Sequence, residues 1–251
     1  NNTLYTQPLM FLMYASILEV LKEKGLESDY TIGLSLGEYG ALYDAKCFDF
    51  KTGLKLLEKR GLYMAEACTK TTGKMSAILG MEADVLLDII SKVNGYSKIA
   101  NYNTYGQLVI SGEENTVLQV NELALTSGAK RAILLNTSGP FHTDLMSHAS
   151  DRFDSYLKDV AIDEPKKRLL LNTTGNFYQN DIKGNMIKQI TSSVMFYQMI
   201  EKLLEKGVNT FIEIGPKKSL SSFVKKIDRQ ATILNIEDLE SLEKTLLKLE
   251  A

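Results

Sequence analysis

The chain has 251 residues, of which 44% are hydrophobic and 24% are charged, and its formal net charge is -2. These proportions are typical of a globular protein with one large core, or with one core and a smaller inserted domain. The small net charge gives no reason to expect nucleic acid as a partner, and no apolar run is expected to span a membrane.

Cysteine and histidine are scarce in this chain. Cys47 and Cys68 have neither metal-ligand spacing nor the look of a disulfide framework, so a reducing cytoplasm is the predicted compartment. His142 and His148 cannot form the usual zinc site without carboxylate or cysteine ligands, and the sequence has no HExxH pair. We therefore predict no metal.

The first predicted element is a helix that begins at Thr6 and Pro8 and ends at Gly25. Its helical spacing predicts a core helix with the apolar stripe Leu9, Leu12, Met13, Ser16, Ile17, Val20 and Leu21. The chain enters this helix almost directly from Asn1, without an initiating methionine, a signal sequence or a first strand. We expect that residues upstream of Asn1 are missing.

Residues 33–37 read G-L-S-L-G, between a short run at 30–32 that favours a buried strand and a predicted helix at 36–45. A serine on a sharp strand-to-helix turn needs small neighbours, and Gly33 and Gly37 meet that need. At a helix N-terminus, the Leu36 N–H is the natural donor to an oxyanion on a substrate carbonyl. A glycine-flanked serine in an ordinary strand-helix connection explains these five residues equally well.

A third helix is predicted over 49–67, with its inward stripe at Leu56, Leu57, Arg60, Tyr63 and Met64. Arg60 therefore lies among apolar residues, where a guanidinium needs a paired anion. That anion is either an internal acid such as Glu38, in a buried salt bridge, or a substrate carboxylate bound bidentately. The pattern alone slightly favours the salt bridge.

Residues 74–135 show a different pattern from the helices before them and are predicted to fold in the order β-α-β-β-α-β. The expected elements are a strand at 75–79, a helix at 82–93, strands at 98–103 and 107–111, a helix at 113–127 and a strand at 130–135. This order is that of a ferredoxin-like α+β subdomain, a compact unit that can fold as an insert.

Strands and helices alternate again after the insert. Strands are predicted at 168–171, 210–214 and 231–234, and helices near 143–160, 185–206, 217–228 and 237–250. This alternation indicates a parallel sheet covered on both faces. We therefore predict an α/β core made of residues 1–73 and 136–251, interrupted by the subdomain at 74–135.

A serine nucleophile needs a base with a pKa near neutrality, and histidine is the usual one. His142 ends the turn-rich S-G-P-F-H stretch of residues 138–142, where loops at one end of a sheet can carry it toward Ser35. His148 falls within the following helical pattern, at the edge of its apolar stripe. We interpret His148 as a partly buried packing residue.

Two pairs of polar residues are further candidates. Asn101 and Asn103 alternate along a strand, so they point to one face and suit an acyl or pantetheine group. Asparagines near a turn, however, more often hydrogen-bond their own backbone. Lys217 and Lys218 lie in a tight strand-to-helix turn, where they are either solvated or face an anionic partner.

Several motifs occur together in a fixed order. They are G-L-S-L-G-E-Y at 33–39, Arg60-Gly61 with Met64, A-N-Y-N at 100–103, G-Q-L-V-I-S-G at 106–112, G-P-F-H-T at 139–143, Gln189, and E-I-G-P-K at 213–217. In this order, and over essentially its whole length, the chain resembles malonyl-CoA:acyl carrier protein transacylases. The ordered set is more specific than G-x-S-x-G alone.

This resemblance implies an α/β-hydrolase-like core with a ferredoxin-like insert. It also implies that Ser35 is the acylated nucleophile, that His142 is its base, and that the Gln189 backbone carbonyl orients His142. Arg60 would hold the malonyl carboxylate. The other expected site residues are Leu36 as oxyanion donor, Met64, Asn101, Asn103 and Phe141 at the substrate, and Lys217 and Lys218 at the carrier protein.

The implied substrates are malonyl-CoA and the phosphopantetheine thiol of an acyl carrier protein in fatty-acid or polyketide synthesis. We expect no bound cofactor and a monomeric enzyme. Phe141, next to the base, is expected to narrow the pocket and to favour malonyl over methylmalonyl groups.

The chain departs from the family pattern at two places. Leu34 stands where the family usually has histidine. The family also begins with a strand and a glycine- and glutamine-rich loop, one of whose backbone amides completes the oxyanion hole, and nothing here matches that segment. Two other functions stay open: an acyl-thioester hydrolase on the same fold, in which water replaces the carrier thiol, and a non-catalytic carrier-protein-binding domain.

Overall fold

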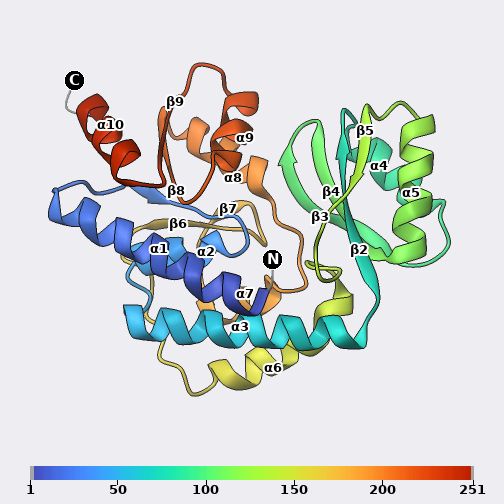
Figure 1. Ribbon diagram of the computed structural model, residues 1–251, viewed down its shortest axis with the longest axis horizontal. Helices are drawn as coiled ribbons and strands as arrows, with labels where there is room; N and C mark the ends of the chain where they lie inside the picture. Colours follow the sequence, from blue (N-terminus) through green and yellow to red (C-terminus); the bar gives the residue numbers. More distant parts are fainter. Residues whose placement is uncertain (1–2, 250–251) are drawn as a thin grey trace.

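The computed structural model describes residues 3–249, in which helices and strands are mixed along the chain (Figure 1). Positions 1 and 251, at the ends of the predicted core, and position 250, at the end of the last predicted helix, lie outside these residues. The first elements are α1 (Thr3–Glu23), β1 (Tyr30–Thr31), α2 (Gly37–Asp44) and α3 (Phe50–Lys70). The Asp49 side chain caps α3 by accepting a hydrogen bond from the Thr52 N–H.

A four-stranded antiparallel sheet stands on the right of Figure 1, with two helices packed on it. Its elements are β2 (Gly73–Leu79), α4 (Ala83–Ser91), β3 (Ser97–Thr104), β4 (Gln107–Glu113), α5 (Glu114–Thr126) and β5 (Arg131–Leu134). The strand order is β3-β4-β2-β5. A separate apolar cluster, which includes Ile78, Leu86 and Val120, lies between the sheet and its helices. The predicted β-α-β-β-α-β order is confirmed.

The later elements surround two small sheets. They are η1 (Asp144–Met146), α6 (Ser147–Leu157), β6 (Arg168–Leu171), β7 (Asn176–Phe177), α7 (Ile182–Lys188), α8 (Phe196–Glu205), β8 (Thr210–Ile214), α9 (Ser219–Ile227), β9 (Thr232–Ile236) and α10 (Leu239–Leu249). β1 pairs in parallel with β6, and β8 pairs in parallel with β9. Both β1 and β8 line one cavity of about 900 Å³, so the two sheets meet at this cavity instead of pairing directly.

The helix predicted over 185–206 is wrong, because the structure divides it into α7 and α8. The break forms tertiary bonds to β3: the Val194 N–H donates to the Ala100 carbonyl at 2.8 Å, and Ser193 Oγ donates to the Ile99 carbonyl at 2.6 Å. The Val194 N–H thus finds its partner on β3 instead of within a helix, so tertiary contacts override local propensity. The break also directs two carbonyls toward the candidate active site.

The buried face of α1 differs from the predicted stripe. The helix begins at Thr3, earlier than predicted, and its buried residues are Gln7, Phe11, Ala15 and Leu21. Four residues of the predicted stripe are exposed: Leu9 at 63%, Leu12 at 45%, Val20 at 36%, and Ser16. Because apolar residues surround most of this helix, spacing alone could not select the face that packs on α3.

The expectation that no run would be apolar enough to cross a membrane is also wrong for α1. This helix has 21 residues and a mean hydropathy of 1.3, which suffices by length and composition, and 22% of its apolar window is buried. A core helix of a soluble protein passes the same test.

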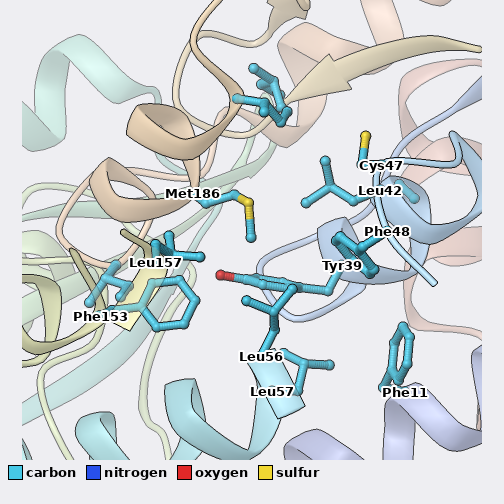
Figure 2. Close-up of a cluster of buried hydrophobic side chains, with 14 of the residues drawn as sticks. Phe11, Tyr39, Leu42, Cys47, Phe48, Leu56, Leu57, Phe153, Leu157 and Met186 are labelled. Carbon is cyan, nitrogen blue, oxygen red and sulfur yellow. The ribbon is translucent and has the colours of Figure 1, made fainter. Parts of the chain in front are cut away.

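The largest buried cluster joins α1, α2, α3, α6 and α7. Figure 2 shows Tyr39 of α2 in its middle, above Leu56 and Leu57 of α3, with its hydroxyl pointing to the side of Met186. Tyr39 is fully buried and meets the ring of Phe153 edge-on, with centroids 6.4 Å apart. This packing holds α2 in place, and with it the turn that carries Ser35.

Candidate active site

Ser35 lies on the turn between β1 and α2 with a positive φ of 53°, an uncommon backbone conformation for a residue with a Cβ. Gly33 is required there, because a Cβ at this position would lie 2.0 Å from the Gly37 carbonyl carbon. The prediction that Gly37 must also be small is wrong, because a Cβ at Gly37 would meet no atom within 4 Å. The turn is therefore tight on one side of Ser35 only.

His142 meets Ser35 across the site, with Ser35 Oγ 2.8 Å from His142 Nε2. The other ring nitrogen, Nδ1, lies 3.0 Å from the Gln189 carbonyl oxygen and 3.1 Å from that of Ser192. Because a carbonyl oxygen only accepts, Nδ1 carries the proton, and Nε2 presents its lone pair to the Ser35 hydroxyl. Both carbonyls come from the break between α7 and α8.

The charge state of His142 suits a proton acceptor. Its side chain is buried, and burial, followed by the positive charge of Arg60, lowers the pKa of His142 to about 4. Hydrogen bonds to the two backbone carbonyls oppose this shift. The imidazole is therefore neutral at neutral pH.

Arg60 is 1% exposed and points at the nucleophile. Its Nη2 donates to Ser35 Oγ at 3.3 Å and to the side-chain oxygen of Gln189 at 2.9 Å, while Nη1 donates to Gln7 Oε1 at 2.7 Å. Burial lowers the pKa of Arg60, and its Nε is buried without a hydrogen-bond partner among the described residues. The alternative interpretation of Arg60, a buried salt bridge to Glu38, is not found, since residues 3–249 contain no ion pair between these two side chains. A guanidinium held by neutral amides keeps its charge available to an anionic ligand.

Glu38 is buried one layer behind Ser35, where it accepts hydrogen bonds from Gln189 Nε2 at 2.9 Å and from the Asn172 N–H at 2.6 Å. Burial raises the pKa of Glu38 to about 7, against the effect of these two bonds and of the Arg60 charge. Gln189 Nε2 also donates to the Ser35 carbonyl oxygen at 3.0 Å. The backbone carbonyl of Gln189 thus contacts His142, and its side chain links Arg60, Glu38 and Ser35.

Four residues at the site were missed by sequence reasoning or given another role: Gln7, Glu38, Asn172 and Ser192. Asn172 had a usable signal, because it directly follows β6, and the carboxyl ends of parallel strands are where α/β proteins bind ligands. Gln7 is a single polar residue on the buried face of α1. Ser192 contributes only its backbone carbonyl, which no side-chain pattern reveals.

Three other predicted residues lie around the site. No described residue accepts a hydrogen bond from the Leu36 N–H, which follows Ser35 directly at the start of α2. Met64 is buried one turn after Arg60, and its sulfur accepts a hydrogen bond from Gln7 Nε2 at 3.4 Å. Phe141 is half-buried beside His142 and packs against the largest cluster.

The remaining predicted residues have no described hydrogen bond to Ser35, His142 or Arg60. Asn101 and Asn103 are both buried on β3, and Asn103 Oδ1 has no hydrogen-bond partner among the described residues. Lys217 and Lys218 are exposed in the turn between β8 and α9. His148 is partly buried on α6, with Nε2 2.9 Å from Lys70 Nζ.

Comparison with known proteins gives one consistent family. Residues 1–243 match the family model described as acyl transferase domain. The malonyl CoA-acyl carrier protein transacylase of Bacillus subtilis is 40% identical over 246 residues, which are 96% of this chain and 78% of that protein.

Solved structures agree with this comparison. The crystal structure of malonyl CoA-acyl carrier protein transacylase from Clostridium perfringens covers all of this chain and 80% of its own, with 41% identity and a TM-score of 0.97. A type II PKS acyl-carrier protein in complex with its malonyl-transacylase provides a second match, with 31% identity, a TM-score of 0.95, and coverage of 99% of this chain and 82% of that one. The chain therefore belongs to the acyl transferase family and, within it, to the malonyl CoA-acyl carrier protein transacylases.

Proposed function

We propose that this chain transfers a malonyl group from malonyl-CoA to the phosphopantetheine thiol of an acyl carrier protein through a malonyl-serine intermediate. One observation carries the proposal: Ser35 Oγ lies 2.8 Å from the base nitrogen of His142 and 3.3 Å from Nη2 of the buried Arg60. A nucleophile, its base and a cation for a carboxylate are thus within reach of one acyl group.

In the first half-reaction, Ser35 Oγ attacks the thioester carbonyl of malonyl-CoA while His142 Nε2 takes the hydroxyl proton. The carbonyl oxygen becomes an oxyanion, for which the Leu36 N–H at the start of α2 is a donor. The tetrahedral intermediate then breaks its C–S bond. Coenzyme A leaves with the proton from His142, and Ser35 carries the malonyl ester.

In the second half-reaction, the phosphopantetheine thiol of the carrier protein attacks the ester carbonyl while His142 takes the thiol proton. The C–O bond breaks, and His142 returns the proton to Ser35 Oγ. No acidic third residue is needed, because the Gln189 and Ser192 carbonyls hold the imidazole in the required tautomer.

Replacing Arg60 should change which acyl group is taken. For Arg60→Ala, we expect malonyl transfer to Ser35 to fall roughly 10²- to 10⁴-fold, because losing one partner of a buried charge pair costs about 3–5 kcal/mol. Acetyl transfer should be spared or raised, since acetyl has no carboxylate for Arg60. Arg60→Lys should also lose the preference, because lysine cannot form the bidentate contact.

The measurement is competition between malonyl-CoA and acetyl-CoA for Ser35, read as the masses of the intact acylated protein. Arg152→Ala is the matched control, because this arginine of α6 lies over the Tyr63 ring and pairs with Glu66, with no described hydrogen bond to Ser35, His142 or Gln189. An unchanged malonyl-to-acetyl ratio in Arg60→Ala would leave Arg60 with a structural role. If water, instead of the thiol of the carrier protein, attacks the acyl-serine, the result favours the acyl-thioester hydrolase over the transferase.

The pH dependence of Ser35 malonylation should reflect the lowered pKa of the buried His142. Only the neutral imidazole accepts a proton, and its pKa is lowered to about 4, so the rate of Ser35 malonylation should persist as pH falls through 6.5 and decline only near pH 4. The check is the single-turnover rate at low malonyl-CoA concentration, at a series of pH values on folded protein. A decline centred near 6.5 would contradict this assignment.

We extend the proposal to the architecture. Parallel pairing of β1 with β6 and of β8 with β9 supports one α/β-hydrolase-like core at 1–73 and 136–251. The β-α-β-β-α-β order with an antiparallel sheet supports a ferredoxin-like insert at 74–135. A site formed within one chain supports a monomer as the active unit. The free thiols of Cys47 and Cys68 support a reducing, cytoplasmic compartment.

The other substrate contacts are proposed from the burial, packing and exposure of the residues concerned. Asn103 Oδ1 is buried and has no hydrogen-bond partner within residues 3–249, which supports a role for β3 in binding a polar acyl-thioester group. Phe141 supports selection against an α-methyl branch through its place beside His142. Lys217 and Lys218 are exposed cations, which suits an acidic carrier protein. Leu34, in place of the family's usual histidine, packs against the apolar cluster of α8 and α9.

A further inference from the structure

Asn172 holds both sides of the turn that carries Ser35. Its side-chain oxygen accepts a hydrogen bond from the Ser35 N–H at 2.6 Å, and its side-chain nitrogen donates to the Gly33 carbonyl at 2.6 Å. One planar amide therefore satisfies a donor and an acceptor two residues apart. An asparagine side chain suits this task because its oxygen accepts and its NH₂ donates.

The turn needs such support because of its backbone conformation. Ser35 has a φ of 53°, a strained conformation for a residue with a Cβ, which persists only where the surrounding structure imposes it. The Ser35 N–H also precedes α2, where backbone donors have no partner within the helix. The Asn172 amide provides that partner and fixes the direction in which Ser35 Oγ leaves the backbone.

Asn172 is itself held rigidly. Its side chain is fully buried, its N–H donates to Glu38 Oε2 at 2.6 Å, and its carbonyl accepts from the Met195 N–H at 2.9 Å. The other oxygen of Glu38 accepts from Gln189, whose carbonyl contacts His142 and whose side chain contacts Arg60. The clamp on Ser35 is thus continuous with the groups that hold the base and the cation.

We infer that Asn172 is a positioning residue for the proposed acyl transfer: it holds the Ser35 turn through two side-chain hydrogen bonds and does not touch the acyl group. The inference rests on the proposed function, since it concerns the same nucleophile. It predicts that losing the two bonds slows attack by Ser35 without weakening the binding of malonyl-CoA. A displacement of about 1 Å at a reacting group can cost roughly 10²-fold in rate.

The test measures single-turnover malonylation of Ser35 by intact-protein mass across malonyl-CoA concentrations. For Asn172→Ala, the maximal rate should fall about 10²-fold while the half-saturating concentration changes little. Asn121→Ala is the matched control, because Asn121 is another buried asparagine, on α5 in the four-stranded sheet unit, and its loss should leave the rate unchanged.

Asn172→Asp keeps the test decisive if the alanine variant fails to fold. A protonated aspartic acid can accept from the Ser35 N–H and donate to the Gly33 carbonyl, whereas the aspartate anion can only accept. The rate of this variant relative to the unsubstituted chain should therefore rise as pH is lowered from 8 to 5.5. Glu38 of α2 is the titratable group that is hydrogen-bonded to Asn172, and Arg60 of α3 and His142 are connected to it through Gln189. Dividing the rate of Asn172→Asp by that of the unsubstituted chain at each pH cancels the effect that these groups have on both proteins.

The outcomes separate the inference from the proposed function. If the unsubstituted chain forms no malonyl adduct, the proposed function fails. If it does, an unchanged maximal rate in Asn172→Ala overturns the positioning role. An equal loss in Asn121→Ala, or an Asn172→Asp ratio that does not change with pH, overturns it as well.

Discussion

Ser35→Ala is expected to abolish the malonyl adduct, with a loss on the order of 10⁶ in the rate of acylation, the scale found when a nucleophile is removed from a catalytic unit. Alanine keeps the Cβ and so leaves the turn beside Gly33 nearly as it is. It removes only the oxygen that contacts His142 Nε2 and Arg60 Nη2. Among residues 3–249, no other hydroxyl or thiol forms a hydrogen bond with His142, so no second nucleophile shares its base.

The measurement is the mass of the intact protein after incubation with malonyl-CoA, followed by mapping of the modified peptide. Ser147→Ala provides the control, because Ser147 is an exposed serine at the start of α6. Addition of a carrier protein should then remove the adduct from the unsubstituted chain. A malonyl adduct that forms on Ser35→Ala at the original rate would show that the nucleophile lies elsewhere.

His142→Ala should slow acylation by about 10²- to 10⁴-fold, the usual range for losing a positioned general base. The change leaves the Ser35 hydroxyl without an acceptor among the residues that the structure describes, because the opposite neighbour, Arg60, only donates. The adduct should still form slowly, since the nucleophile and the Leu36 N–H remain. Single-turnover kinetics with malonyl-CoA in excess give this rate directly.

The other histidine provides the comparison for this variant. His148 of α6 is partly buried and lies beside Lys70 at the end of α3, and His148→Ala should change the rate little. Added imidazole is expected to restore part of the activity of His142→Ala, because the vacated space lies against Ser35 Oγ. Equal effects of the two substitutions would mean that His142 is not the base.

Local sequence determined those parts of the protein whose signals are contained within one element. The alternation of strands and helices over 74–135 predicted the β-α-β-β-α-β order, because strand and helix periods differ and the connecting turns are short. The threes-and-fours spacing in α3 predicted that Arg60 would be buried, and it is 1% exposed. The glycine before Ser35 predicted a tight turn, which the close approach of Gly33 to Gly37 confirms.

Only the tertiary structure decided which partners the buried polar groups take. Spacing in α3 could not choose between Glu38 and other acceptors for Arg60, because burial alone does not specify the atom opposite the guanidinium. Likewise, α1 is apolar on most sides, so the packing of α3 selected the face of Phe11 and Ala15 over that of Leu9.

The turn that carries Ser35 shows most clearly the difference between what local sequence determined and what tertiary packing decided. Ser35 and Asn172 are 137 positions apart in the chain, yet they are joined by a hydrogen bond of 2.6 Å. The helix predicted over 185–206 is interrupted because its middle bonds to β3 and its carbonyls face His142. A hydrogen bond forms only at short range and in a suitable direction, and both conditions depend on how distant segments pack, which local periodicity does not record.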